Sequence, residues 1–111
     1  HLGVPAMFVE RQDGEFTLRR NFHLDNTMNV VVIEDVISTG LSSRECIDAV
    51  QKTGANVLAL ACLIDRSGGA AKFNVPFIPL ARIKVAAWDA DKLPKHLAGT
   101  PAVKPGSRGL K

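Results

Sequence analysis

The chain has 111 residues, of which 46% are apolar and 23% charged, and its formal net charge is +3. This length allows one globular core, so we treat residues 1–111 as a single domain. The mild basicity suits an anionic small-molecule ligand but is too diffuse to predict nucleic-acid binding. The sequence has no run of about 18 apolar residues, and therefore no membrane span or membrane partner is predicted.

The first residues, His1-Leu2-Gly3-Val4-Pro5, resemble the end of a helix, with a glycine cap and a proline entering a strand. The helix that this pattern would end is not in the sequence. We therefore expect the chain to be the C-terminal half of a longer protein, incomplete at its N-terminus.

A β-hairpin is predicted next. Residues 6–11 and 15–20 are interpreted as short strands, and Asp13-Gly14 between them favours a tight turn. Arginines at the two open ends of the hairpin could bind a diphosphate, because each guanidinium offers a planar fork of donors. A solvated edge ribbon without a ligand is the alternative, and the local sequence alone favours it. The arginines concerned are Arg11, Arg19 and Arg20.

The most informative stretch runs from Val30 to Ser42 and reads VVVIEDVISTGLS. Its β-branched beginning is typical of a strand buried on both faces, as in a parallel α/β sheet. Glu34 and Asp35 follow at the tip of this strand, and a loop of small and hydroxyl-bearing residues leads to a helix. Ser42 and Glu45 have the spacing of a capping box that would open the helix.

This arrangement of residues suits a phosphorylated sugar. The first amides of a helix have no intrahelical partner and, with the helix dipole, they attract anions. Gly40 lets the backbone approach a phosphate, and Ser38, Thr39 and Ser42 offer hydroxyl donors. The two acids would repel a bare phosphate but can bind ribose hydroxyls, or a magnesium ion that accompanies a diphosphate. An ordinary strand–helix crossover with an acidic strand end is the alternative without a ligand.

A strand–helix–strand unit follows from the next segments. The helix is predicted over residues 43–53, with Gly54 as its C-cap, and a second apolar strand over residues 56–64. The core-facing stripe of the helix comprises Cys46, Ile47 and Val50. Cys46 and Cys62 fall in apolar segments, so both are expected to be reduced core residues, which suits the cytoplasm.

Ligands of doubly wound sheets bind beyond the carboxyl ends of the strands. We therefore expect the end of the first strand, at Glu34 and Asp35, to open on the same side as Asp65 and Arg66. Arg66 there could bind a carboxylate or a ring carbonyl, or it could form an ion pair with a nearby acid.

The remaining chain is less regular. Residues 75–85 should hold one more strand, which Pro76 and Pro79 confine towards the edge of the sheet. A short helix is predicted over residues 89–97, where Pro94 weakens the pattern. Residues 100–111 are predicted to be an extended tail.

Three of these segments resemble the bacterial orotate phosphoribosyltransferases, which belong to the type I phosphoribosyltransferases. The stretch from Val30 to Ser42 resembles the family's signature for phosphoribosyl diphosphate (PRPP), and residues 8–22 resemble the segment that precedes it. Leu63-Ile64-Asp65-Arg66 resembles the segment that contacts orotate. The resemblance implies a three-layer, doubly wound, mostly parallel α/β fold, a hairpin that acts as a mobile loop, and a homodimer.

The resemblance also implies roles for individual residues. Glu34 and Asp35 would bind the ribose hydroxyls, with Asp35 the best candidate for a catalytic residue. Arg66 and Ser38 would contact orotate, and magnesium would be held through PRPP and not by protein ligands. The other PRPP-binding positions would be Val36, Ile37, Ser38, Thr39, Gly40, Leu41, Ser42, Arg11, Arg19 and Arg20.

The implied reaction is a glycosyl transfer in pyrimidine biosynthesis, in which orotate and PRPP give orotidine 5′-phosphate and diphosphate. A purine-type phosphoribosyltransferase and a non-catalytic PRPP-binding regulator are the alternatives. Arg66 favours orotate, because a carboxylate substrate suits an arginine and a neutral purine does not. The hairpin arginines argue against a regulator that has lost its diphosphate contacts.

Overall fold

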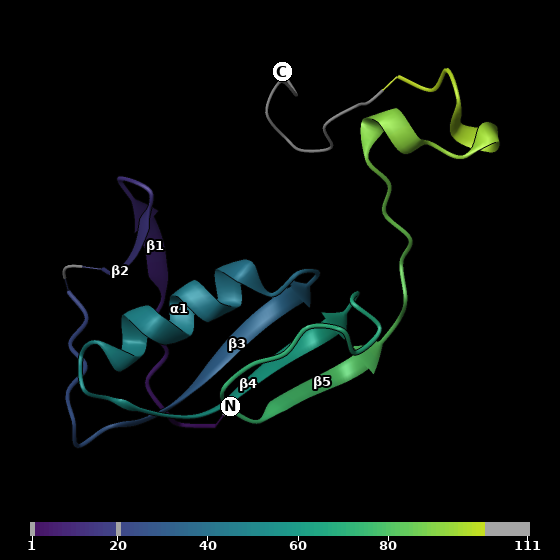
Figure 1. Ribbon diagram of the computed structural model, residues 1–111. Helices are drawn as coiled ribbons and strands as arrows, with labels where there is room; N and C mark the ends of the chain where they lie inside the picture. The colour runs from purple at the N-terminus through teal and green to yellow at the C-terminus, as the bar shows by residue number, and fades with distance from the viewer. Residues whose placement is uncertain (1, 20, 102–111) are drawn as a thin grey trace.

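The computed structural model describes residues 2–19 and 21–101 (Figure 1). Its elements, in chain order, are β1 (Val9–Gln12), β2 (Glu15–Leu18), β3 (Asn29–Ile37), α1 (Leu41–Gln51), β4 (Asn56–Asp65), β5 (Phe77–Arg82) and the short 3-10 turns η1 (Ala90–Lys92) and η2 (Lys95–Leu97). The predictions made for His1, Arg20 and residues 102–111 of the tail lie outside the described residues.

A parallel sheet with the strand order β3-β4-β5 forms the centre of the fold. Ile37 of β3 pairs with Asp65 of β4, which in turn pairs with Arg82 of β5. The carboxyl ends of all three strands therefore meet at one edge of the sheet. This confirms the predicted strand–helix–strand unit and the prediction that the two acidic strand ends open on the same side.

The core lies between α1 and the sheet. Ile47 of α1 and Leu60 of β4 are completely buried, and Cys46 and Val50 lie in the same apolar cluster. The predicted core-facing stripe of the helix is confirmed. Cys46 and Cys62 are both buried and free, as predicted.

The face of the sheet opposite α1 is open in the described part of the chain. Ile33 of β3 is 69% exposed and Leu80 of β5 is 82% exposed. Figure 1 shows α1 lying over one side of the sheet only. The prediction that the first strand is buried on both faces is therefore wrong: its side chains alternate, and a single helix covers one set of them. The predicted α/β class is confirmed, whereas the described residues form two layers and not three.

Helix α1 begins two residues earlier than predicted. Its N-cap is Gly40, in the left-handed conformation, and no side chain caps the helix. The predicted capping box of Ser42 and Glu45 is wrong, because Glu45 forms an ion pair with Arg11 instead. The C-cap is Lys52, and Gly54, predicted for that role, lies two residues further on with a φ of +91°.

The predicted hairpin is confirmed, with shorter strands. β1 and β2 pair antiparallel around Asp13 and Gly14, whose φ angles of 51° and 92° are those that a tight hairpin turn requires. Val9 and Leu18 pack against the edge of the core.

The segments at the C-terminal side of the sheet agree in part with expectation. β5 lies at an edge, as its prolines predict, because a proline cannot donate a ladder hydrogen bond. The predicted helix over residues 89–97 is replaced by η1 and η2, since Pro94 interrupts the chain between them. These turns lie away from the sheet (Figure 1). No helix within residues 2–19 and 21–101 is long and apolar enough to span a membrane.

Candidate functional site

The candidate site lies at the carboxyl edge of the sheet, where the end of β3, the beginning of α1 and the end of β4 come together. β3 continues to Ile37, so Glu34 and Asp35 lie within the last residues of the strand and not at a tip beyond it. Because successive side chains of a strand alternate, the two carboxylates point to opposite faces of the sheet.

Glu34 lies on the α1 side and is half-buried. Burial raises its pKa, the neighbouring charge of Asp35 raises it further, and the hydroxyl of Ser43 partly opposes both effects. Asp35 is exposed, and its Oδ1 accepts the amide of Val36 at 2.6 Å. Most of the acceptor capacity of both carboxylates is therefore left for hydroxyl groups of a ligand.

The loop between β3 and α1 places hydroxyl groups around a constrained glycine. Ser38 and Thr39 are exposed, and Thr39 Oγ1 accepts the amide of Leu41 at 3.3 Å. Gly40 has a φ of +76°, and a Cβ atom there would lie 2.7 Å from Phe73 Cζ. Glycine is thus required both for its backbone conformation and for lack of space. The amides of the first helical turn, which have no intrahelical acceptors, follow this loop directly.

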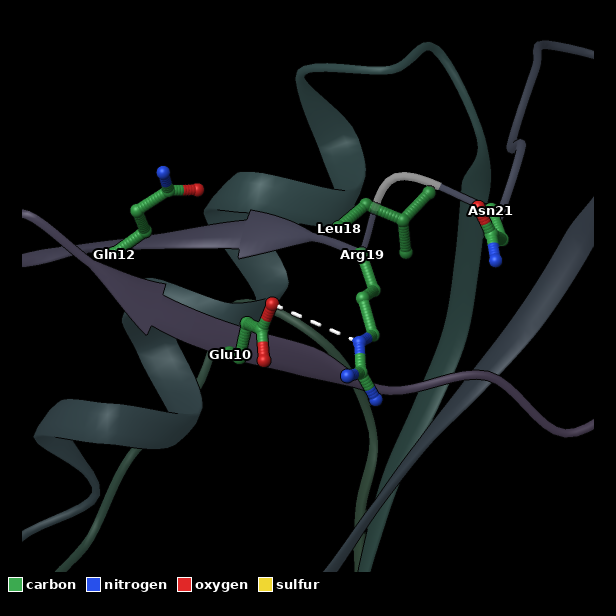
Figure 2. A pocket seen from close by; sticks show the side chains of 5 residues that line it. All are labelled: Glu10, Gln12, Leu18, Arg19 and Asn21. Carbon is green, nitrogen blue, oxygen red and sulfur yellow. Dashed lines mark ion pairs between the residues drawn. The ribbon is translucent and has the colours of Figure 1, made fainter.

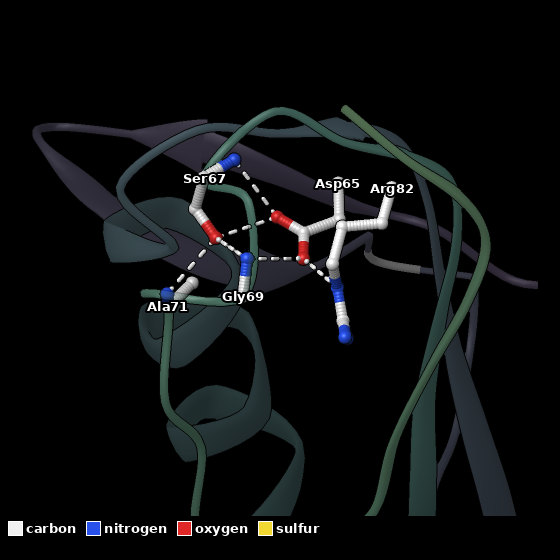
Figure 3. A network of polar contacts seen from close by, with 5 residues as sticks. All are labelled: Asp65, Ser67, Gly69, Ala71 and Arg82. Atoms are coloured by element: carbon white, nitrogen blue, oxygen red, sulfur yellow. Dashed lines mark hydrogen bonds and ion pairs between the residues drawn. The ribbon is translucent and has the colours of Figure 1, made fainter. Parts of the chain in front are cut away.

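The end of β4 contains a network that the sequence did not predict (Figure 3). The side chain of Asp65 is completely buried. Its Oδ1 accepts the amide of Ser67 at 2.8 Å and the Ser67 hydroxyl at 2.6 Å. Its Oδ2 accepts the amide of Gly69 at 3.2 Å and Arg82 Nε at 2.9 Å.

Burial alone would raise the pKa of Asp65, but the hydrogen bonds from Ser67 and the ion pair with Arg82 together lower it below its ordinary value. Ser67 Oγ also accepts the amide of Ala71 at 3.0 Å. Asp65 therefore shapes the loop that follows β4 and has no acceptor capacity left for a ligand.

Arg66 lies at the same edge with its side chain exposed, and its amide donates to the carbonyl of Ile37 at 2.8 Å. The acid beside it in the sequence, Asp65, is paired with Arg82. The structure thus places Arg66 directly against the end of β3. The predicted contact of the Arg66 side chain with orotate stays a prediction.

Of the hairpin arginines, the structure describes Arg11 and Arg19, and neither forms a hydrogen bond or ion pair with the signature loop. Arg11 forms an ion pair with Glu45 of α1 and lies 4.6 Å from the ring centroid of Phe16. Arg19 lies 3.9 Å from Glu10 (Figure 2). Glu10 and Arg19 line a pocket of about 410 Å³ together with Gln12, Leu18 and Asn21. The predicted diphosphate contacts of Arg11 and Arg19 stay predictions.

Sequence reasoning missed two further arginines of this edge, Arg44 and Arg82. Arg82 lies 17 positions from Asp65 in the chain, and only the pairing of β4 with β5 brings them together. Arg44 follows the signature within α1, and its contacts with the loop are side chain to backbone. No spacing or composition signal in the sequence indicates this role for Arg44.

A parallel α/β sheet, an acidic strand end followed by a glycine at the start of a helix, and an arginine at the end of the next strand are consistent with a fragment of a type I phosphoribosyltransferase. No family model matches the chain. Over 110 residues it is 62% identical to an orotate phosphoribosyltransferase from Parvibaculum lavamentivorans, covering 99% of this chain and 57% of that protein. The protein of the same name from Maricaulis maris is 59% identical over 109 residues, which are 98% of this chain and 56% of that protein.

A third relative, the orotate phosphoribosyltransferase of Caulobacter vibrioides, is 53% identical over the whole chain and 57% of its own length. Over nearly its whole length the chain is therefore similar to orotate phosphoribosyltransferases. It spans a little over half the length of the curated relatives that it matches, and its expected place as a C-terminal half stays a prediction.

Proposed function

We propose that the protein transfers the phosphoribosyl group of PRPP to orotate, giving orotidine 5′-phosphate and diphosphate in pyrimidine biosynthesis. The observation that supports this proposal is the backbone hydrogen bond of 2.8 Å from the amide of Arg66 to the carbonyl of Ile37, because it joins the backbone of an exposed arginine to the end of the signature strand. A site for a carboxylate-bearing base would thereby lie next to a site for a phosphorylated sugar. The names of the relatives support the same reaction.

Each part of PRPP has a counterpart at this edge. Glu34 and Asp35 would accept hydrogen bonds from the ribose hydroxyls. The hydroxyls of Ser38, Thr39 and Ser42, together with the first amides of α1, would bind the 5-phosphate. The remaining predicted PRPP-binding positions would contact PRPP through their backbone. They are Val36, Ile37, Gly40 and Leu41.

The protein groups would act mainly by positioning. Arg66 and Ser38 would orient orotate so that its ring nitrogen faces the ribosyl carbon from which diphosphate departs. Mg²⁺, bound through the diphosphate, would neutralise part of the negative charge on the departing diphosphate. The exposed carboxylate of Asp35 is an oxygen ligand of the kind that could contact Mg²⁺ through water. Asp35, next to the ribose, is the group best placed to stabilise positive charge that develops on it.

Arg11 would contact the diphosphate only after leaving Glu45, because the two form an ion pair in this structure. This exchange is consistent with a hairpin that moves between two positions. Arg19 and Arg20 are the other proposed diphosphate contacts. The homodimer implied by the family stays a prediction, as does the cytoplasmic location, which the two free buried thiols favour.

Calorimetric titration of PRPP with Mg²⁺ tests the sugar-phosphate part of the proposal. We expect the unaltered chain to bind and Asp35→Ala to lose most of the affinity, with Asp48→Ala as a control on an exposed carboxylate of α1. Formation of orotidine 5′-phosphate by the complete protein tests the reaction. A complete protein that binds PRPP but makes no orotidine 5′-phosphate would favour the regulator, and one that prefers a purine base would favour the purine-type enzyme.

A further inference from the structure

Arg44 connects two loops at the edge where PRPP is proposed to bind. Its Nη2 donates to the carbonyl oxygen of Thr39 at 3.1 Å, and its Nη1 donates to the carbonyl oxygen of Lys72 at 3.2 Å. The guanidinium also lies 5.8 Å from the ring centroid of Phe73. Among the described residues no carboxylate forms an ion pair with Arg44. Both hydrogen bonds end on backbone carbonyls, so its positive charge is not neutralised.

The contact with Thr39 fixes the orientation of one peptide group. In a planar trans peptide the C=O and N–H bonds point in opposite directions. Since the Thr39 carbonyl points to Arg44, the amide of Gly40 in the same peptide points away from Arg44. Rotation of this peptide would exchange the two groups and turn a carbonyl oxygen towards a bound anion.

Gly40 makes such a rotation easy unless another group prevents it. A glycine adopts positive and negative φ with similar ease, so its own backbone does not select one orientation of the preceding peptide. The present φ is +76°. The side chain that hydrogen-bonds to this peptide is Arg44, which also contacts the Lys72 carbonyl and the ring of Phe73.

We propose that Arg44 is a positioning residue that holds the Thr39 carbonyl, and so directs the Gly40 amide towards the 5-phosphate of PRPP. This inference rests on the proposed function, and it names a group that acts without touching the substrate. The unneutralised charge of Arg44 behind the loop strengthens the same site.

Two substitutions separate this role from a purely structural one. Arg44→Met keeps much of the aliphatic packing but removes both hydrogen bonds and the charge. Lys72→Met is the matched control, because it removes one exposed positive charge nearby while the Lys72 carbonyl stays in place. Arg44→Lys keeps the positive charge but removes the guanidinium, whose two nitrogens donate to both carbonyls.

Ribose 5-phosphate is the probe, since it carries the 5-phosphate without the diphosphate. We expect Arg44→Met to weaken its binding roughly tenfold or more, the size of a lost hydrogen bond to a charged group. Arg44→Lys should be intermediate, and Lys72→Met close to the unaltered chain. In the complete protein the KM for PRPP should rise while the KM for orotate is unchanged. Equal affinities for Arg44→Met and Lys72→Met would overturn the inference.

A measurement without ligand keeps the two proposals apart. The ¹⁵N–¹H resonance of the Gly40 amide reports its hydrogen-bonding environment, and we expect it to shift or broaden in Arg44→Met but not in Lys72→Met. An unchanged Gly40 resonance in a folded Arg44→Met chain would overturn the positioning role alone. If the unaltered chain bound neither PRPP nor ribose 5-phosphate, the proposed function would fail, and the Gly40 resonance would still decide whether Arg44 orients the peptide.

Discussion

The two acidic strand ends of the sheet differ in how their carboxylates are used. At the end of β3, Asp35 is exposed and accepts one backbone amide, while Glu34 is half-buried with a raised pKa. At the end of β4, Asp65 is buried, accepts four hydrogen bonds and has a lowered pKa. The two ends are adjacent and point to the same edge, yet only the first has acceptors left for a ligand.

This difference shows that an acid at the end of a parallel strand is not by itself a binding residue. What decides is whether its lone pairs are already occupied by the protein. Asp65 organises the loop that presents Arg66, whereas Glu34 and Asp35 are themselves available. Substitutions at the two ends should therefore change different properties.

The largest effect on stability is expected from Asp65→Ala. It removes the acceptor for Arg82, the Ser67 hydroxyl and two amides, so we expect the free energy of unfolding to fall by about 3 kcal/mol. Urea denaturation followed by circular dichroism measures this change. A loss below about 1 kcal/mol would mean that the network contributes little to stability.

Substitution at the other end should weaken ligand binding and leave stability nearly unchanged. For Asp35→Asn we expect PRPP affinity to fall roughly tenfold, because a charged acceptor for the ribose hydroxyls is lost. The free energy of unfolding should change by no more than about 0.5 kcal/mol, as for other exposed positions. If Asp35→Asn destabilised the chain as much as Asp65→Ala, the distinction between the two ends would be wrong.

The two ends should also respond to pH with opposite signs. The lowered pKa of Asp65 means that its contribution to stability is present above its unfolded-state pKa and is lost as pH falls through the folded-state value, below about pH 4. The raised pKa of Glu34 means that its ionisation opposes folding, and this cost disappears as pH falls through the raised value. The free energy of unfolding should therefore fall less steeply with acidification in Asp65→Asn than in the unaltered chain. In Glu34→Gln the free energy of unfolding should rise near neutral pH. A steeper acid decline in Asp65→Asn, or a lower stability of Glu34→Gln at neutral pH, would contradict the assignment.

The smallest effect concerns the cysteines, since each acidic end has a nearby thiol. Burial raises the pKa of Cys46, and the charge of Glu34 raises it further. Burial also raises the pKa of Cys62, with smaller contributions from Asp65 and Glu34. We expect both thiols to react slowly with alkylating reagents in the folded chain. Glu34→Gln should speed the reaction of Cys46 by up to a few-fold, measured by mass spectrometry of the labelled peptides, with Asp48→Asn as the control.

Much of the fold could be predicted because it depends on local patterns. The hairpin turn at Asp13-Gly14, the strand–helix–strand order and the core stripe around Ile47 all follow from short-range periodicity and turn chemistry. The exposure of Ile33 could not be predicted, because an apolar run in a sequence does not tell how many layers cover the strand. The start of α1 was missed because Gly40 ends the loop through its backbone conformation and leaves Ser42 and Glu45 without a capping role.

The candidate site could be predicted in part for the same reason. Its signature residues are contiguous in sequence, so Glu34, Asp35 and the loop after them were assigned together. Arg44 and Arg82 act through the backbone of another loop and through a carboxylate of another strand. Their roles depend on tertiary contacts that no spacing rule describes.

Gly40 is confined by two independent constraints, and this limits how the sequence can drift. Its positive φ disfavours every side chain, and Phe73 occupies the space that a Cβ atom would need. Shortening Phe73 would remove the second constraint but leave the first, so no single neighbouring change makes an alanine acceptable at position 40. A substitution of Gly40 therefore remains unfavourable whether it arises before or after a change at Phe73.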